Sequence, residues 1–165
     1  MITDPEMLRI RGYLQSQAAK PIDYLIDKVE EGITELAAAA NAIDPAKRTV
    51  VPPGETWSPT DCLKHATNSD IHCATQILTV ALTGELPAGR EEDAGGTFEA
   101  MLARHREALD SLYEHVRAAD PEGFLQVKWE HPFFGDLNWR EWLLFLRIHA
   151  KDHSGQLQAM RAAMA

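Results

Sequence analysis

The sequence predicts an all-α protein, a four-helix bundle with an extra N-terminal helical segment, and three observations lead to this expectation. Apolar residues recur every three or four positions in four long stretches, at about 21–43, 58–82, 97–119 and 138–160; this spacing gives a helix one apolar face. No period-two alternation runs long enough to build a sheet. The connections hold about a dozen residues or more, which indicates a bundle other than the simple short-loop kind.

The N-terminal part of the chain contains a short helical segment and then the first long helix. Residues 5–18 form the short amphipathic segment, and the pattern leaves open whether it is a separate helix or is joined to the next by a kink. Pro21 begins the long helix, because proline at the first position loses no hydrogen bond. The helix runs through an alanine tract to about Ile43. Its apolar positions are Ile22, Leu25, Ile26, Val29, Ile33 and Leu36.

The second long helix has a distinct start signal after the extended linker 49–55. Ser58 is the expected N-cap, Pro59 the first helical residue and Asp61 a favourable charge in the first turn. The helix ends at about Leu82, before Gly84. Its apolar face holds Cys62, Leu63, Ala66, Cys73, Ala74, Ile77 and Ala81, and a polar seam on one flank holds His65, Ser69, His72 and Gln76.

The third and fourth long helices enclose an aromatic segment. Thr97 caps the third helix after the acidic loop 85–96, and Asp120-Pro121 ends it. Residues 122–137 are expected to be irregular, with one short extended piece at 126–130; their aromatic residues either line a pocket or plug the end of the bundle, and we favour the plug. Asn138 and Glu141 then form a capping pair that begins the last helix.

Composition limits the classes of function. At 165 residues the chain fits a single domain, 1–165. A net charge of −9 without a basic cluster gives no support for binding to nucleic acid or to an anionic membrane. No signal peptide and no membrane-spanning apolar run is evident. Cys62 and Cys73 lie roughly 16 Å apart on one helix, too far for a disulfide, so a reduced cytoplasmic protein is expected.

Two histidines in the last helix are the most informative residues. At about 100° per residue, His149 and His153 lie within an apolar face completed by Trp142, Leu146, Leu157 and Met160. Imidazole is uncommon there without a partner. A metal ion explains the pair, because side chains four residues apart converge on one point. The alternative is two core histidines that only form hydrogen bonds.

Two familiar metal motifs are absent. A zincin needs Glu directly after the first histidine, and this chain has Ala150 there, so a metalloprotease is disfavoured. No helix carries Glu-x-x-His, which argues against a ferritin-like di-iron site.

A stable site needs a third ligand, and His65 is the first choice because it lies beside an apolar face. Asp61, one turn earlier, either accepts its free ring N–H or is only a first-turn charge. His105 is the competing ligand. His72, about 10 Å further along the axis, is a candidate pocket residue. The remaining two, His115 and His131, are expected at the surface and in a loop.

Two segments resemble the DinB-like (YfiT-like) metalloproteins. The stretch from Trp57 to His65 is similar to their tryptophan-serine helix entry, and residues 135–156 resemble their final helix, including Gln156 one turn after the second histidine. The resemblance covers about residues 22–160. It implies an up-down-down-up bundle, commonly a homodimer, that binds one divalent ion, zinc or nickel, through His65, His149 and His153. The extra segment 5–18 would then extend the dimer interface or cover the site.

Some members of that family are thiol-dependent transferases or isomerases that use a low-molecular-weight thiol. The resemblance therefore implies a small-molecule substrate and such a thiol cosubstrate. A hydrolase acting through metal-bound water and a non-catalytic metal-binding bundle are the alternatives. Asp152, Gln156, Ser69 and His72 are candidates for orienting ligands, although solvated or packing roles are the commoner ones for such residues.

Overall fold

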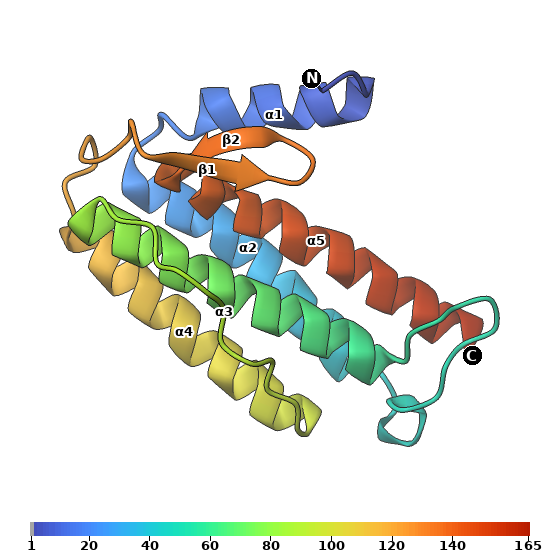
Figure 1. Ribbon diagram of the computed structural model, residues 1–165. Helices are drawn as coiled ribbons and strands as arrows, with labels where there is room; N and C mark the ends of the chain where they lie inside the picture. Colours follow the sequence, from blue (N-terminus) through green and yellow to red (C-terminus); the bar gives the residue numbers. More distant parts are fainter. Residues whose placement is uncertain (1) are drawn as a thin grey trace.

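The computed structural model describes residues 2–165, and helices account for most of them (Figure 1). The elements, in chain order, are α1 (Pro5–Gln17), α2 (Ile22–Asn41), the short 3₁₀ helix η1 (Pro45–Lys47), α3 (Pro59–Thr83), α4 (Phe98–Ala118), β1 (Lys128–His131), β2 (Gly135–Asn138) and α5 (Trp139–Ala163). The predicted all-α four-helix bundle with an N-terminal helical addition is confirmed.

The four long helices pack around one core. α5 packs against α2 and α3, and α4 packs against the same two helices from the other side. α2 and α5 run in one direction and α3 and α4 in the other (Figure 1), so the predicted up-down-down-up topology is confirmed. Since α3 and α4 are parallel, the connection 84–97 has to travel back along the length of α3.

The helix ends follow the capping residues in the sequence. Ser58 Oγ accepts the N–H of Asp61, and the Asp61 carboxylate accepts the N–H of Ser58 at 2.9 Å, so the two residues cap α3 reciprocally. Thr97 caps α4 and Asn138 caps α5. Gly84 follows α3 with φ of 75°, a left-handed conformation that glycine adopts without strain.

The aromatic segment differs from its prediction. We expected irregular chain with one extended piece at 126–130, whereas β1 and β2 form an antiparallel hairpin in which Lys128 pairs with Asn138. Each strand has only four residues, too few for a recognisable alternation pattern. The hairpin is fixed from outside, because Trp129 stacks on Trp142 of α5 with ring centroids 5.4 Å apart.

The N-terminal segment is a helix of its own, which settles the question that the sequence left open. α1 buries Leu14 and packs on α5. Arg140 of α5 ties the break between α1 and α2 to the bundle, since its guanidinium donates to the carbonyl oxygens of Ala18 and Lys20 and also to that of Pro121. In Figure 1, α1 and the hairpin lie together on one side of the bundle.

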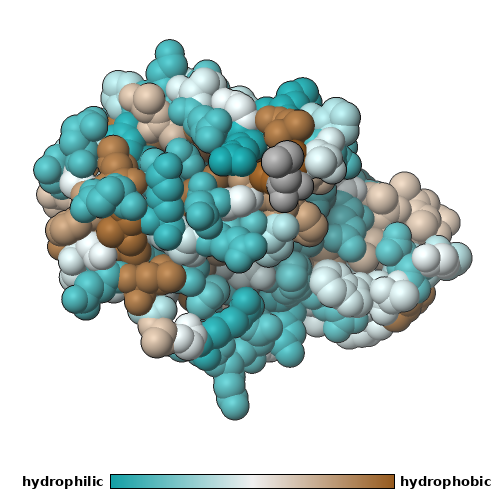
Figure 2. All heavy atoms as spheres, turned by 45° about the horizontal axis from the view of Figure 1, so that its top comes forward, coloured by the Kyte–Doolittle hydropathy of each residue, from teal (hydrophilic) through white to brown (hydrophobic). Residues whose placement is uncertain are grey.

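The face that carries α1 and the hairpin is mostly hydrophilic, and its apolar residues form separate small patches (Figure 2). Among residues 2–165, no helix is both long enough and apolar enough to cross a membrane.

Candidate metal centre

Three histidines from two helices meet between α3 and α5. One ring nitrogen from each of His65, His149 and His153 lies within 4.8 Å of the others. The ring centroid of His65 is 5.0 Å from that of His153 and 5.8 Å from that of His149. The Nε2 atoms of His149 and His153 are 3.0 Å apart. The residues proposed as ligands from the sequence are therefore brought together by the fold.

Helix packing explains this convergence. The i,i+4 spacing stacks His149 and His153 on the buried face of α5, where Trp142, Leu146 and Leu157 anchor the helix in the core. His65 is the least buried of the three. Its ring lies 5.0 Å from that of Trp57, the half-exposed residue before the α3 cap. The cluster is thus closed on the core side and accessible beside α3.

Asp70 of α3 holds the cluster from the core side. Its side chain is fully buried, and its two oxygens accept hydrogen bonds from His149 Nδ1 at 2.8 Å and from His105 Nε2 at 2.7 Å. Burial raises the carboxyl pKa, but these two hydrogen bonds outweigh it and hold the pKa at about 2. Burial in turn opposes the charged form of His149, yet the hydrogen bond and charge of Asp70 raise its pKa.

The sequence reasoning missed Asp70, although a signal was present. Asp70 lies four residues after Ala66 and four before Ala74, so it falls on the apolar face of α3, where an unpaired carboxylate is costly. His105, the competing third ligand, is one of the two histidines whose hydrogen bonds satisfy the Asp70 carboxylate. His105 faces Asp70 and is not among the three converging histidines.

Gln156 orients the second histidine of α5. Its Oε1 accepts from His153 Nδ1 at 2.9 Å and from the Cys62 thiol at 3.4 Å. Burial, followed by the charges of Asp152 and Glu55, raises the Cys62 pKa to about 12, so the thiol keeps its proton and acts as a donor. Two donors converge on this oxygen, which is the side of the amide that accepts. Gln156 thus has a structural contact to the site, as one of the candidate orienting residues.

These contacts leave the two Nε2 atoms without a donor between them. Asp70 accepts only, so His149 Nδ1 carries its hydrogen, and Gln156 Oε1 places a hydrogen on His153 Nδ1 in the same way. Both Nε2 lone pairs then face each other across 3.0 Å, an arrangement that a cation between them would stabilise. The donor set therefore fits a metal ion.

For His65 and His153 the pKa shifts favour the neutral imidazole that metal ligation requires, whereas Asp70 raises the pKa of His149. Burial lowers the pKa of His65, and the nearby charged forms of His153 and His149 lower it further. Burial and then His149 lower the pKa of His153 as well.

The other predicted site residues lie elsewhere. Asp61 does not orient His65, because its carboxylate is committed to Ser58; the first-turn-charge alternative is the one that the structure supports. Within residues 2–165, the Ser69 and Asp152 side chains form no hydrogen bond to the three histidines, although the charge of Asp152 acts on His149 and His153. His72 lines a separate pocket beneath the connection 84–97.

His131 was expected in a loop, and this prediction is wrong. The side chain is 5% exposed, and its Nδ1 accepts the backbone N–H groups of Phe133 and Phe134, which closes the hairpin turn. Burial, assisted by the charge of His149, lowers its pKa to about 4. The ring packs against Phe145, whose own ring lies 5.6 Å from that of His149. The aromatic segment therefore forms a wall next to the histidine cluster.

The fold and this site together define a helical-bundle protein with a three-histidine cluster that can hold a metal ion. The chain belongs to the DinB superfamily, whose sequence profile matches residues 28–157, a range that includes all three histidines. The family resemblance found in the sequence is thereby confirmed. A comparison with curated proteins gives no match.

Two solved structures share the fold. One is TT2238, described as a four-helix bundle protein; it is 26% identical with a TM-score of 0.60, and the alignment covers 84% of this chain and 99% of TT2238. The other is a mycothiol-dependent maleylpyruvate isomerase, 14% identical with a TM-score of 0.66. The alignment covers 84% of this chain and 61% of the isomerase, so this chain spans less than two thirds of that enzyme.

Proposed function

We propose that His65, His149 and His153 bind one divalent metal ion, zinc or nickel, and that the protein is a thiol-dependent transferase or isomerase acting on a small molecule. The observation that carries the proposal is the convergence of three imidazoles of which two have their rings oriented from behind, one by Asp70 and one by Gln156. Such outer hydrogen bonds fix the tautomer and direction of a ligating histidine.

The ligand count supports a reactive site over a structural one. Structural zinc normally has four protein ligands, whereas three converge here. The neighbouring Cys62 thiol is protonated and donates to Gln156, so it does not complete the set. A bound divalent ion would favour the deprotonated form of a thiol or of water at the open position.

The surrounding residues favour the thiol reaction over hydrolysis. A hydrolase profits from a free carboxylate that serves as general base. Asp70, the carboxylate that contacts the cluster, is buried and already accepts two hydrogen bonds, and Asp61 is held by Ser58. Asp152 is exposed, and no hydrogen bond to the three histidines directs its carboxylate towards the open position. On the core side of the cluster, Asp70 therefore orients His149 and balances the charge of a bound ion. Trp57 and His65 border the accessible side.

Metal analysis of protein purified without a His-tag tests the site. About one divalent ion per chain is expected, with near-zero metal in His149→Ala and full metal in His115→Ala, a matched control on the exposed face of α4. Metal retained by His149→Ala would refute the site. Metal lost in His105→Ala and kept in His65→Ala would mean that the third ligand is His105.

The reaction is tested by incubating the metal-loaded protein with 1-chloro-2,4-dinitrobenzene and glutathione, bacillithiol or mycothiol. Metal-dependent consumption of one thiol is the expected result. Ester or amide hydrolysis without thiol turnover would support the hydrolase alternative. Bound metal with neither reaction would support the non-catalytic bundle.

We also propose a cytoplasmic homodimer that binds neither nucleic acid nor membrane. The family resemblance supports the dimer, and the net charge of −9 argues against polyanionic partners. Light scattering on purified protein tests the dimer, with a single-chain mass of 18.4 kDa as the contradicting result.

A further inference from the structure

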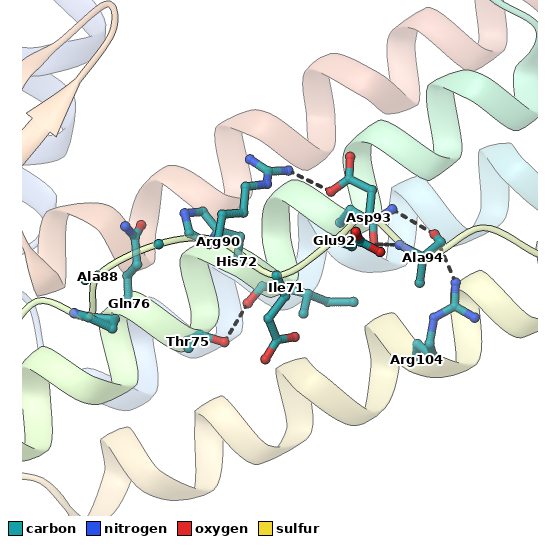
Figure 3. Close-up of a pocket in the computed structure, with 14 residues that line it drawn as sticks. Ile71, His72, Thr75, Gln76, Ala88, Arg90, Glu92, Asp93, Ala94 and Arg104 are labelled. Atoms are coloured by element: carbon teal, nitrogen blue, oxygen red, sulfur yellow. Dashed lines mark hydrogen bonds and ion pairs between the residues drawn. The ribbon is translucent and has the colours of Figure 1, made fainter.

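A second polar feature lies beside the histidine cluster, beneath the connection that crosses α3. There the segment 87–94 and the flank of α3 enclose a pocket of about 490 Å³ (Figure 3). This volume lies in the range of small-molecule sites, about 300–1,000 Å³.

The wall of this pocket is held in place by specific hydrogen bonds. Asn68 of α3 donates to the carbonyl oxygen of Ala94 at 2.8 Å and accepts the N–H of the same residue at 3.2 Å. Arg104 of α4 donates to the carbonyl oxygens of Ala94 and Gly95. The crossing segment is therefore tied to two helices at the end of the pocket.

The lining carries charges of both signs and donors that remain free. Arg90 bonds Asp93 through one Nη at 3.1 Å, which leaves other guanidinium donors for a ligand. Among residues 2–165, Arg104 Nε is buried without a hydrogen-bond partner at the edge of the same pocket. Glu91 and Glu92 add carboxylates. A cavity with both kinds of charge suits a zwitterion better than a simple anion or an apolar ligand.

The pocket is aligned with the histidine cluster. His65 and His72 are seven residues apart, nearly two full turns, so they share one flank of α3 about 10 Å apart along the axis. Asn68, which lines the pocket, lies between them, three residues after His65 and four before His72.

We propose that this pocket binds the charged, sulfur-free end of an amino-acid-derived thiol, with a ligand carboxylate at Arg90 and an ammonium group at the Glu91 and Glu92 carboxylates. The sulfur end then extends along α3 towards His65. A tripeptide-sized thiol is at most about 10 Å long when extended, so a thiol of this size that is held in the pocket can direct its sulfur along α3 towards His65. The inference rests on the proposed thiol-dependent function and assigns that thiol its chemical class.

S-methylglutathione is the probe that separates the pocket from the metal, because its blocked sulfur cannot act as a thiolate ligand. Calorimetry is expected to detect its binding to the metal-free His149→Ala protein. Arg90→Ala in that background should weaken binding about tenfold, the loss of one charge-assisted contact. Arg117→Ala removes an exposed arginine paired with Asp23, away from the pocket, and should bind the probe unchanged. No binding, or equal binding by the two arginine variants, overturns the proposal.

A second variant guards against a folding effect of the first. Thr75→Trp fills the pocket from the exposed flank of α3 and leaves Arg90 in place. In the His149→Ala background, Thr75→Trp should also abolish probe binding, and retained probe binding contradicts the pocket as drawn. In the protein with His149 intact, Thr75→Trp should still bind one metal ion per chain. Probe binding without any thiol turnover would refute the proposed function and leave the pocket standing. If glutathione is turned over and Arg90→Ala leaves its turnover unaltered, the proposed function stands and the pocket proposal is refuted.

Discussion

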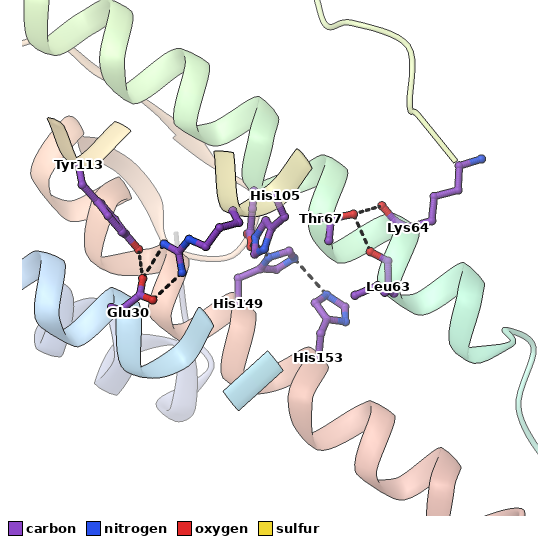
Figure 4. Close-up of polar contacts among 10 residues, drawn as sticks. Glu30, Leu63, Lys64, Thr67, His105, Tyr113, His149 and His153 are labelled. Atoms are coloured by element: carbon purple, nitrogen blue, oxygen red, sulfur yellow. Dashed lines mark hydrogen bonds and ion pairs between the residues drawn. The ribbon is translucent and has the colours of Figure 1, made fainter. Parts of the chain in front are cut away.

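Two polar networks join helices within the bundle, and they differ in how well their donors and acceptors match (Figure 4). Between α2 and α4, Glu30 accepts two hydrogen bonds from Arg106, at 2.5 and 2.9 Å, and one from Tyr113 at 3.0 Å. Every contact there pairs a donor with an acceptor. Among α3, α4 and α5, Asp70 is equally well matched, but the next contact, between the Nε2 atoms of His149 and His153, joins two acceptors when both rings are neutral.

The difference separates a structural network from a site. The Glu30 network needs nothing from outside the chain. The histidine network is incomplete until a positively charged species lies between its nitrogens. Burial of polar groups alone therefore does not indicate a functional site. A contact between two acceptors does indicate one when paired donors and acceptors hold both groups in place.

The largest expected effect is that of metal on stability. A ligand that binds only the folded chain at a thousandfold excess over its Kd stabilises it by about 4 kcal/mol. Adding zinc to metal-free protein should raise Tm accordingly, as measured by differential scanning fluorimetry. The same addition should leave Tm of His149→Ala unchanged. An equal rise in that variant would remove the distinction between the two networks.

His131 offers a contrasting histidine, because both hydrogen bonds to its Nδ1 pair a backbone donor with this acceptor. Its pKa of about 4 in the folded chain lies below the ordinary value of 6.5, so between these values the unfolded chain binds the additional proton. Stability should therefore fall as pH drops from about 6.5 to about 4, by about 2 to 3 kcal/mol from this residue.

Urea unfolding of metal-free protein at pH 7 and pH 5 measures this effect. His131→Asn keeps an acceptor for the N–H groups of Phe133 and Phe134 but cannot titrate. It should lose less stability than the wild type over that pH interval. An identical pH dependence in the two proteins would contradict the assignment of a neutral buried imidazole.

Asp70→Asn tests how far orientation behind a ligand matters. The amide keeps the shape of the side chain but removes the charge beside His149. Metal affinity should fall 10- to 100-fold, which a competing chelator titration measures. Glu30→Gln is the control in the matched network, and its metal affinity should equal that of the wild type.

The smallest expected effect is on the stability of Glu30→Gln itself. Its ion pair with Arg106 is partly exposed, with 37% and 41% of the two side chains accessible, so solvent screens it. A loss of about 1 kcal/mol in urea unfolding is expected. A loss as large as that of Asp70→Asn would show that the two networks do not differ in burial cost.

Local signals explain what the sequence could predict. The caps at Ser58, Thr97 and Asn138 are set by residues within three positions, and the spacing of His149 and His153 fixes one face of a helix. Such local signals do not predict contacts between elements that are distant in the sequence. The hairpin has strands too short to show a period and depends on Trp142.

The same limit accounts for the residues that were missed. Asp70 looked like one polar residue among apolar ones until His105 and His149 arrived from other helices. His131 lies next to a turn whose amide hydrogens it accepts, which no spacing rule indicates. His65 ranked above His105 because it lies beside the apolar face of its helix, and the family resemblance implied the same residue.

The parallel course of α3 and α4 restricts how the gene can vary in length. α4 has 21 residues and so measures about 30 Å, and a fully extended chain covers about 3.3 Å per residue, so at least about nine residues must link the helices. The interval between Gly84 and Thr97 holds few more than that. Deletions of more than a few codons there should prevent the bundle from closing.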